Sequence, residues 1–384
     1  MDGYNFTKEE LNRYARHFAI PEFGLSGQQK LKNSKVLVVG AGGLGSPVLL
    51  YLAAAGVGTI GIVDFDTVDL SNLQRQVLYK VADIGQSKAV LAKERLLAMN
   101  PNLNVVVYQE AFTRENALEL VEQYDVVADG TDNFPTRYLV NDACVLKGKV
   151  NVYASIFRFE GQVSVFNLNA KDGSRGPNYR DLFPEPPPPD MVPNCAEGGV
   201  LGVLPGIIGS LQACEVIKVL TGVGEPLNGR LFLFDAASFT TRVLKFPINP
   251  DLEISGLIDY DEFCGIPSKQ AVVDEEELSV QSLADMHQQA EEFFLLDVRE
   301  VYEFEADHMG GQLIPLGNLP DSLSTLPKDK KIVVHCRSGQ RSKKAVQLLK
   351  ANGFPAVYNL TGGILAWREV YGPSNINLNS NTTA

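Results

Sequence analysis

The chain has 384 residues, of which 45% are hydrophobic and 21% are charged. This is the composition of a folded globular protein, and the length predicts two or three domains at about 150 residues per domain. The 46 acidic residues outnumber the 34 Lys and Arg residues, which gives a net charge of −12. Because a chain of this sign repels phosphate backbones, direct binding to nucleic acid is not expected.

The amino terminus carries acidic residues and lacks the apolar run of a signal peptide. Nowhere do about eighteen apolar residues follow one another, so no membrane segment is expected either. The 5 cysteines are an odd number spread along the chain, which fits reduced thiols better than a disulfide framework. These features predict a cytoplasmic protein.

The first two thirds of the sequence predict a mostly parallel α/β sheet. An apolar strand at 35–39 leads through a Gly-rich turn into a helix at 46–57 and a second strand at 59–64, which is one βαβ unit. The same alternation continues downstream. It predicts strands at 105–108, 125–128, 152–156, 162–166, 231–236 and 240–246, and helices at 89–99 and 206–220.

A second, smaller α/β pattern follows a break. Residues 247–277 lose periodicity and end in the acidic run DEEE, the composition of an interdomain linker. The proline-rich stretch 183–193 cannot be helical. The later pattern has strands at 293–298, 331–335 and 356–360 and a helix at 342–351. We therefore expect domains at 1–250 and 278–372, a linker at 251–277 and a disordered tail at 373–384.

The hexapeptide Gly40–Gly45 (GAGGLG) has the G-x-G-x-x-G spacing, directly after a strand and before a helix. With Asp64 at the end of the next strand to hold a ribose, this motif alone favours a nicotinamide or flavin dinucleotide. Arg75 and Lys88 instead suit the charge of a triphosphate, and the run DGTDNF (129–134) at a strand end suits Mg²⁺. Together these residues predict ATP rather than NAD.

These motifs follow the order found in the ubiquitin-activating-like adenylyltransferases of the MoeB and ThiF type, which the chain resembles over about residues 5–245. The matching stretches are RYARH, GAGGLG, VDFDTVDLSNLQRQ, GQSK, DGTDNF and NCAEGGVLGVLPGIIG. The resemblance implies a Rossmann-like domain that uses ATP and Mg²⁺ to adenylate the carboxyl-terminal Gly-Gly carboxylate of a small ubiquitin-like sulfur carrier. The adenylate supplies the leaving group that a carboxylate lacks.

The resemblance also implies roles for single residues. Asp132 binds Mg²⁺, and Arg16 reaches the ATP of a neighbouring subunit, which implies a homodimer. A solvated helix charge is the alternative for Arg16, and a turn cap is the alternative for Asp129. The residues expected at the ATP site are Gly40, Gly42, Gly43, Gly45, Asp64, Asp66, Asn72, Arg75, Gln76, Lys88, Asp132 and Asn133.

The cysteines depart from the family pattern. Many members hold zinc with two C-x-x-C pairs, but the matching positions here read NYRD (178–181) and LEIS (252–255), so no zinc is expected. Cys195 aligns with a thioester or resolving cysteine of relatives, with a structural role as the alternative. Cys144 and Cys214 lie in apolar helical patterns and are expected to be buried.

Cys336 opens the loop CRSGQRS between a short apolar strand and a helix. Loop N–H groups, the helix amino terminus, Arg337 and Arg341 favour an anionic sulfur there. Only four residues separate Cys336 from Arg341, one fewer than in the phosphate loop of tyrosine phosphatases, so the loop suits a sulfur atom. With LLDVREVYEFEADH upstream and GGILAW downstream, residues 278–372 resemble a single-domain rhodanese, whose cysteine carries a persulfide.

Together the two domains resemble adenylyltransferase–sulfurtransferase fusions of the MoeZ type. In such a fusion the Cys336 persulfide attacks the acyl-adenylate, and a second thiol, Cys195, releases the carrier thiocarboxylate. Molybdopterin synthesis is the expected pathway, and thiamin, cysteine or tRNA thiolation are the alternatives. The expected sulfur donor is thiosulfate or a cysteine desulfurase. An NAD-dependent oxidoreductase and a non-enzymatic scaffold for a ubiquitin-like partner are the alternatives from other classes.

Overall fold

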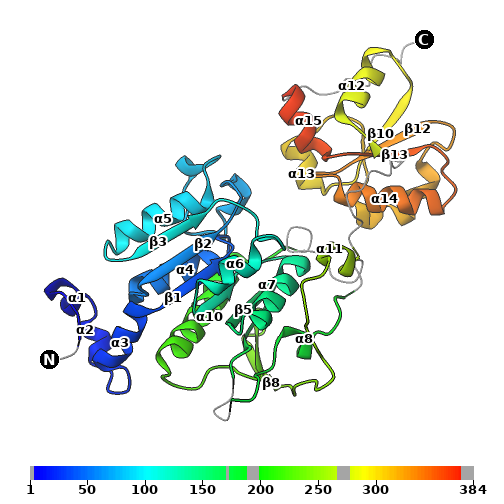
Figure 1. Cartoon of the computed structure of the whole chain (residues 1–384). Coiled ribbons are helices and arrows are strands. Elements are labelled where there is room, and N and C mark those ends of the chain that lie inside the picture. Colours follow the sequence, from blue (N-terminus) through cyan, green and yellow to red (C-terminus); the bar gives the residue numbers. More distant parts are fainter. Residues whose placement is uncertain (1–3, 170–172, 188–198, 266–276, 373–384) are drawn as a thin grey trace. The chain divides into compact units, whose positions relative to one another are not determined.

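The computed structural model describes residues 4–169, 173–187, 199–265 and 277–372. The chain divides into two compact units, Met1–Ser268 and Lys269–Ala384 (Figure 1). Each unit has its own sheet and its own hydrophobic cores. The predicted α/β class, with a mostly parallel first sheet and a smaller second domain, is confirmed.

Within the described residues, the sheet of the first unit has eight strands in the order β3-β2-β1-β4-β5-β6-β7-β8. The pairs from β3 to β5 are parallel, whereas β5 to β8 are joined antiparallel. The strands are β1 (Lys35–Val39), β2 (Thr59–Val63), β3 (Asn104–Tyr108), β4 (Val126–Asp129), β5 (Val150–Phe157), β6 (Glu160–Phe166), β7 (Arg230–Asp235) and β8 (Thr240–Lys245).

Helices cover both faces of this sheet (Figure 1). On β1, Val36 and Val38 pack into the core beneath α4, α5 and α10, whereas Leu37 and Val39 pack into the core beneath α6 and α7. Burial on both faces explains the continuous apolar run of this strand. The helices are α1 (Lys8–Arg13), α2 (Ala15–Phe18), α3 (Gly24–Asn33), α4 (Gly45–Ala55), α5 (Lys88–Met99), α6 (Ala117–Glu122), α7 (Phe134–Leu146), α8 (Tyr179–Leu182), α10 (Leu204–Thr221) and α11 (Tyr260–Phe263), with 3₁₀ turns η1 (Leu70–Asn72) and η2 (Val81–Asp83).

Helix α10 is long and apolar enough to span a membrane by length and composition alone, but half of it is buried inside the protein. It packs against α4, β5 and β6. Its fully buried Gln212 donates hydrogen bonds to the backbone oxygens of Asp129 (2.7 Å) and Val152 (2.8 Å). The apolar composition of α10 is therefore that of a core helix.

An ion pair ties together the corner at which the sequence lacks thiols. The fully buried carboxylate of Asp181 accepts two hydrogen bonds from the Arg175 guanidinium, at 2.7 and 3.0 Å. It also accepts the backbone N–H groups of Asn178 (2.7 Å) and Asn249 (2.8 Å). Arg175 in turn donates to the Asn249 carbonyl at 3.0 Å. This network joins α8 to the segment that follows β8.

Part of the segment assigned to the linker packs on the first unit. Helix α11 lies against α7, and the Tyr260 hydroxyl donates to the Asp142 carboxylate at 2.8 Å. Asp142 also accepts the Arg180 guanidinium at 2.7 Å in a buried ion pair. The rest of the expected linker, 266–276, and the expected tail, 373–384, lie outside the described residues.

The described part of the second unit contains a parallel sheet of five strands in the order β11-β10-β12-β13-β9. Ile332 and Val334 of β12 pack toward α14, whereas Val333 packs into a second core with α12 and α15. The elements are β9 (Glu277–Leu278), α12 (Val280–Gln288), β10 (Phe293–Asp297), α13 (Val301–Ala306), β11 (Gln312–Leu313), η3 (Leu316–Asn318), η4 (Pro320–Thr325), β12 (Lys331–His335), α14 (Gln340–Ala351), β13 (Val357–Leu360) and α15 (Gly363–Tyr371).

Candidate active sites

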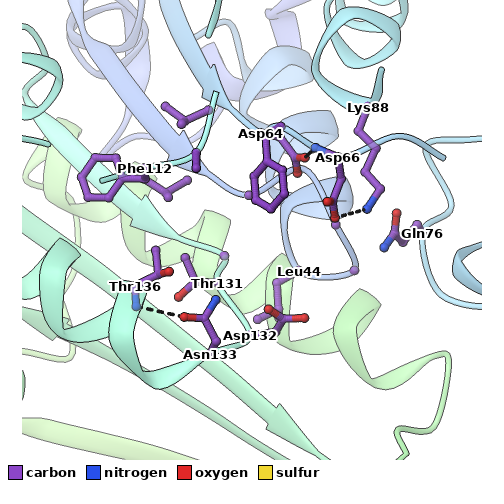
Figure 2. A pocket seen from close by; sticks show the side chains of 18 of the residues that line it. Leu44, Asp64, Asp66, Gln76, Lys88, Phe112, Thr131, Asp132, Asn133 and Thr136 are labelled. Atoms are coloured by element: carbon purple, nitrogen blue, oxygen red, sulfur yellow. Dashed lines mark hydrogen bonds and ion pairs between the residues drawn. The ribbon is translucent and has the colours of Figure 1, made fainter. Parts of the chain in front are cut away.

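A pocket of about 970 Å³, open to solvent, lies at the carboxyl ends of β1 to β4. Here the strand order reverses between β1 and β4, which is where ligands bind in open α/β sheets. Figure 2 shows acidic and cationic side chains from the end of β2 and the start of α5 facing the loop after β4. The predicted ATP-site residues that line the pocket are Gly40, Gly42, Gly43, Asp64, Asp66, Arg75, Gln76, Lys88, Asp132 and Asn133.

The glycine turn brings two loops close together. Gly40 has a φ of +93°, and a Cβ there would lie 3.0 Å from the Gly130 carbonyl oxygen. Gly45 does not line the pocket; a Cβ on it would lie 2.0 Å from the Gly40 oxygen. Gly45 therefore allows the tight passage from β1 into α4, and Gly40 allows the approach of the loop after β4.

Asp64 links the glycine turn to the loop that follows β2. One of its carboxylate oxygens accepts the Ala41 N–H of the glycine turn at 2.7 Å, and the other accepts the Asp66 N–H at 2.8 Å. Burial raises the pKa of Asp64, while these two hydrogen bonds oppose that shift. Asp64 thus orders both loops at this edge of the sheet and still lines the pocket.

Lys88 and Asp66 form an ion pair of 2.9 Å at the pocket wall (Figure 2). The Lys88 side chain is 5% exposed and the Asp66 side chain 52%. Asp66 therefore partners the ammonium from the solvent side. An anion that entered the pocket would compete with Asp66 for the Lys88 ammonium.

The loop after Asp66 has its own internal bonds. Arg75 donates to the Ser71 carbonyl at 3.0 Å. Asn72 does not line the pocket; its side chain accepts the Asp69 N–H at 3.2 Å, and its carbonyl accepts the backbone N–H groups of the residues that follow the turn. The buried Gln76 lines the pocket, and within the described residues its Oε1 has no hydrogen-bond donor.

The turn after β4 is held from two sides. Asp129 is fully buried, and one of its carboxylate oxygens accepts the N–H (2.9 Å) and the hydroxyl (2.6 Å) of Thr131. Burial raises the pKa of Asp129. The buried Arg137 donates to the Thr131 carbonyl at 3.2 Å. These contacts agree with the turn-cap interpretation of Asp129, and they fix the residue next to Asp132.

Asp132 and Asn133 follow this turn at the start of α7. The Asn133 side chain accepts the Thr136 N–H at 2.9 Å (Figure 2) and caps the helix. A proline follows in the first turn of this helix. Asp132 is exposed, and among the described residues its carboxylate accepts no hydrogen bond. A free carboxylate at this position fits the hard oxygen ligand that Mg²⁺ prefers.

The structure adds pocket residues that the sequence reasoning missed. Thr131, Thr136 and Arg137 lie on or just before α7, and Arg137 follows Asn133 by one helical turn. Glu110 and Phe112 follow β3, the outermost parallel strand. The residues after β3 and after β4 could have been predicted from the sequence, because the carboxyl ends of parallel strands meet at one edge of the sheet.

The structure describes one of the two predicted catalytic residues of the first unit. Arg16 is exposed on α2 and does not line the pocket of its own chain. Cys195 lies outside the described residues.

The helical cysteines differ from each other. Cys144 is buried as predicted, but the prediction for Cys214 is wrong, because it is exposed. Apolar residues run all around α10, so the sequence pattern does not show that Leu211 and Cys214 share the outward stripe.

In the second unit, the sulfur of Cys336 lies inside its loop. Its Sγ accepts the Gly339 N–H at 3.2 Å and the Ser342 hydroxyl at 3.4 Å, and the residue is 1% exposed. Gly363 opens α15 against the same loop, and a Cβ on it would lie 2.4 Å from the Cys336 carbonyl oxygen. The Ile364 N–H donates to that oxygen at 2.9 Å. The loop predicted to surround the sulfur is therefore packed between α14 and α15.

Arg341 forms a bidentate ion pair with Glu303, at 2.6 and 2.7 Å. The sequence predicts that the Arg341 charge acts on the sulfur of Cys336, and it does not predict this ion pair. Burial opposes ionisation of Glu303, but the hydrogen bonds from Arg341 and from the Glu300 N–H hold its pKa below the usual range. The hydrogen bonds that Arg341 donates to the Glu303 carboxylate raise the pKa of Arg341.

Behind the loop lies a buried polar group of the core. Asp297 and Arg299 form an ion pair of 2.6 Å, and Arg299 also donates to the Asp307 carbonyl at 2.8 Å. The fully buried His335 ring lies 3.6 Å from the Asp297 carboxylate. Burial lowers the pKa of His335 to about 4, although Asp297 opposes the shift. The His308 ring stacks on Phe304 at 4.4 Å.

Comparison with known proteins assigns both units. The ThiF family model matches residues 14–253, and the rhodanese-like domain model matches residues 279–370. Over 376 residues, covering 96% of each chain, the protein is 49% identical to the "Probable adenylyltransferase/sulfurtransferase MoeZ" of Mycobacterium tuberculosis. It is 42% identical to the "Adenylyltransferase and sulfurtransferase MOCS3-1" of Zea mays, covering 95% of this chain and 83% of that one.

The first unit alone has further relatives. The "Sulfur carrier protein adenylyltransferase" of Thermus thermophilus is 53% identical over 268 residues, which cover 68% of this chain and 99% of that protein. Among solved structures, Escherichia coli MccB with MccA-N7isoASN has a TM-score of 0.55 at 24% identity, covering 66% of this chain and 76% of that one, a likeness of fold. The chain therefore belongs to the ThiF family, carries a carboxy-terminal rhodanese domain, and is an enzyme of the adenylyltransferase and sulfurtransferase class.

Proposed function

We propose that the first unit adenylates the carboxyl-terminal Gly-Gly carboxylate of a small ubiquitin-like sulfur carrier with ATP, and that Cys336 of the second unit supplies the sulfur as a persulfide. The observation that carries this proposal is the meeting of Arg75, Lys88 and Asp132 at one pocket, in a chain that also holds a thiol within a donor-lined loop. A relative named for sulfur carrier adenylation supports the choice of substrate.

In the first half-reaction the carrier carboxylate attacks the α-phosphorus of ATP, and the bond to the β-phosphate oxygen breaks to release pyrophosphate. Lys88 and Arg75 neutralise the phosphate charge, once Lys88 exchanges its Asp66 partner for a phosphate oxygen. Asp132 would hold Mg²⁺, which supplies charge neutralisation on the phosphates, and Asn133 lies beside it in the pocket. Asp64, which lines the pocket, orients the ribose.

In the second half-reaction the terminal sulfur of the Cys336 persulfide attacks the acyl carbon, and AMP leaves. The product is an acyl disulfide between the carrier and Cys336. A second thiol, assigned here to Cys195, attacks Cys336 Sγ and releases the carrier thiocarboxylate. The disulfide left behind is reduced by a cellular thiol.

The finer parts of the proposal concern assembly and pathway. Arg16 is exposed and absent from the pocket of its own chain, which is what a residue serving a neighbouring subunit of a homodimer requires. The described cysteines are free thiols, which fits a cytoplasmic enzyme. We assign molybdopterin synthesis as the pathway, with thiosulfate or a cysteine desulfurase as the source of sulfur.

ATP–pyrophosphate exchange tests the adenylation step. Exchange should require a carrier ending in Gly-Gly, and the carrier for molybdopterin should be preferred over those for thiamin, cysteine or tRNA thiolation. Asp132→Ala should remove exchange without unfolding the protein, and mixing it with Arg16→Ala should restore part of the activity in mixed dimers. Normal exchange by folded Asp132→Ala would remove Asp132 from the site, and mixed dimers without activity would contradict the role of Arg16.

A further inference from the structure

The ion pair between Glu303 and Arg341 lies at the edge of the sheet where Cys336 is placed. Helix α13 follows β10, and α14 follows β12, its parallel neighbour. Glu303 on α13 and Arg341 in the first turn of α14 therefore come from the same carboxyl edge of the sheet as Cys336. The pair therefore lies close enough to the sulfur for Cys336 to act on Arg341 electrostatically.

Both partners are held firmly. One Glu303 oxygen accepts Arg341 Nη1 at 2.6 Å and the Glu300 N–H at 3.0 Å, and the other accepts Nη2 at 2.7 Å. The side chains of Glu303 and Arg341 are 15% and 23% exposed. Arg299 also donates to the Glu303 carbonyl, at 3.4 Å. Charge-assisted bidentate pairs of this kind are among the stronger polar contacts in proteins.

The pair changes what Arg341 offers to a sulfur donor. An unpaired guanidinium beside a thiol attracts anions and binds oxyanions with its two Nη groups. Here both Nη groups already face a carboxylate, and the two charges cancel. A small dianion that approaches Cys336 gains nothing from Arg341 unless two charge-assisted bonds break first.

We propose that Glu303 sets the donor specificity of Cys336 by holding Arg341, so that small dianionic sulfur donors bind weakly and a persulfide presented by a protein is favoured. This inference rests on the proposed role of Cys336 as sulfur carrier. With thiosulfate the Cys336 thiolate attacks the outer sulfur, the S–S bond breaks, and sulfite leaves with the electron pair. The negative charge stays on the new persulfide, so atoms and charges balance without a further reactant.

The test compares Glu303→Gln with Glu305→Gln, an exposed residue of the same helix, in the full-length protein. Sulfur transfer to cyanide is measured with thiosulfate, a dianion, and with benzenethiosulfonate, a monoanion. In Glu303→Gln the KM for thiosulfate should fall on the order of tenfold, because the Arg341 charge is released toward the donor. The KM for the monoanion should fall less, kcat should change little, and Glu305→Gln should behave as the wild type.

An unchanged or higher KM for thiosulfate in folded Glu303→Gln overturns the proposal, and so does an equal fall for the two donors. If Glu303→Gln does not fold, Glu303→Asp keeps the charge on a shorter side chain and loosens the pair. That variant should show a smaller fall in the thiosulfate KM, and a KM equal to the wild type counts against the proposal. If Cys336→Ala transfers sulfur as well as the wild type, the proposed function itself has failed, which is a separate outcome.

Discussion

The fully buried carboxylate of Asp129 accepts both the backbone N–H and the side-chain hydroxyl of Thr131, at 2.9 and 2.6 Å. The two hydrogen bonds fix the turn whose next residue is Asp132. Arg137 holds the Thr131 carbonyl from the other side. The position of Asp132 in the pocket thus depends on the buried side chains of Asp129 and Arg137.

Thr131→Val should weaken both stability and adenylation. The substitution keeps the shape of the side chain and removes one donor to a buried carboxylate, which costs about 1–3 kcal/mol. Displacement of Asp132 by up to about 1 Å lowers adenylation by up to about 100-fold. Urea unfolding and pyrophosphate exchange measure the two effects. Thr131→Ser restores the hydroxyl and should recover both, so a Ser variant as impaired as the Val variant would argue against the hydrogen bond.

Asp181→Ala should destabilise the first unit by about 2–4 kcal/mol. The variant leaves Arg175 and two backbone N–H groups at the corner without their acceptor. Loss of far-UV circular dichroism on heating measures the effect. The matched control is Glu185→Ala, which changes an exposed residue nearby in the chain that makes no ion pair among the described residues. A chelator should leave the wild-type midpoint unchanged; a large drop on chelation would show that a metal holds this corner.

Acidification should weaken the second unit through His335. The folded pKa of about 4 lies below the ordinary value of 6.5, so the unfolded chain binds the proton more tightly. The stabilising contribution is complete above pH 6.5 and is lost as the pH falls toward 4, by about 3 kcal/mol in total. The single tryptophan of the chain, Trp367, is buried in α15, so its fluorescence follows unfolding of this unit selectively.

His335→Leu should flatten this pH dependence between pH 6.5 and 4, since it removes the titrating group while filling a similar volume. His287→Leu, which changes a histidine on α12 in the same unit, is the control and should retain the slope. Equal slopes in the wild type and His335→Leu would assign the acid sensitivity to other groups.

Cys336→Ala should separate the two half-reactions. Pyrophosphate exchange depends on the first unit and should survive, whereas sulfur transfer from thiosulfate and persulfide labelling should vanish. Mass spectrometry of the carrier should show no replacement of oxygen by sulfur. Free sulfide is added in a separate reaction, because the adenylate accepts any good nucleophile. A variant that still forms thiocarboxylate from thiosulfate would exclude Cys336 as the carrier of sulfur.

The hydrophobic pattern and the order of the strands and helices predict much of the first unit's fold. The run 35–39 is apolar on both faces because helices cover both faces of β1, and the order of strands and helices then places Gly40, Asp64 and Asp132 at one edge of the sheet. The predicted Asp66 and Lys88 meet there as an ion pair, which spacing alone does not reveal.

The remaining features depend on distances between segments far apart in the chain. Glu303 and Arg341 are 38 residues apart, and only the pairing of β10 with β12 brings their helices together. Arg175 and Asn249 are 74 residues apart. The exposure of Cys214 could not be predicted even from its own helix. An apolar helix has no polar stripe from which its outward face can be recognised.

The enclosure of Cys336 also governs how long its sulfur survives. A small thiol in solution must reach Cys336 Sγ in line with the S–S bond of the persulfide, and a residue that is 1% exposed leaves little room for an attacking thiol that the protein does not position. We expect the folded protein to retain the persulfide sulfur during incubation with glutathione, and the unfolded protein to lose it. The Cys336 persulfide would then persist long enough for the protein to be purified with its sulfur bound.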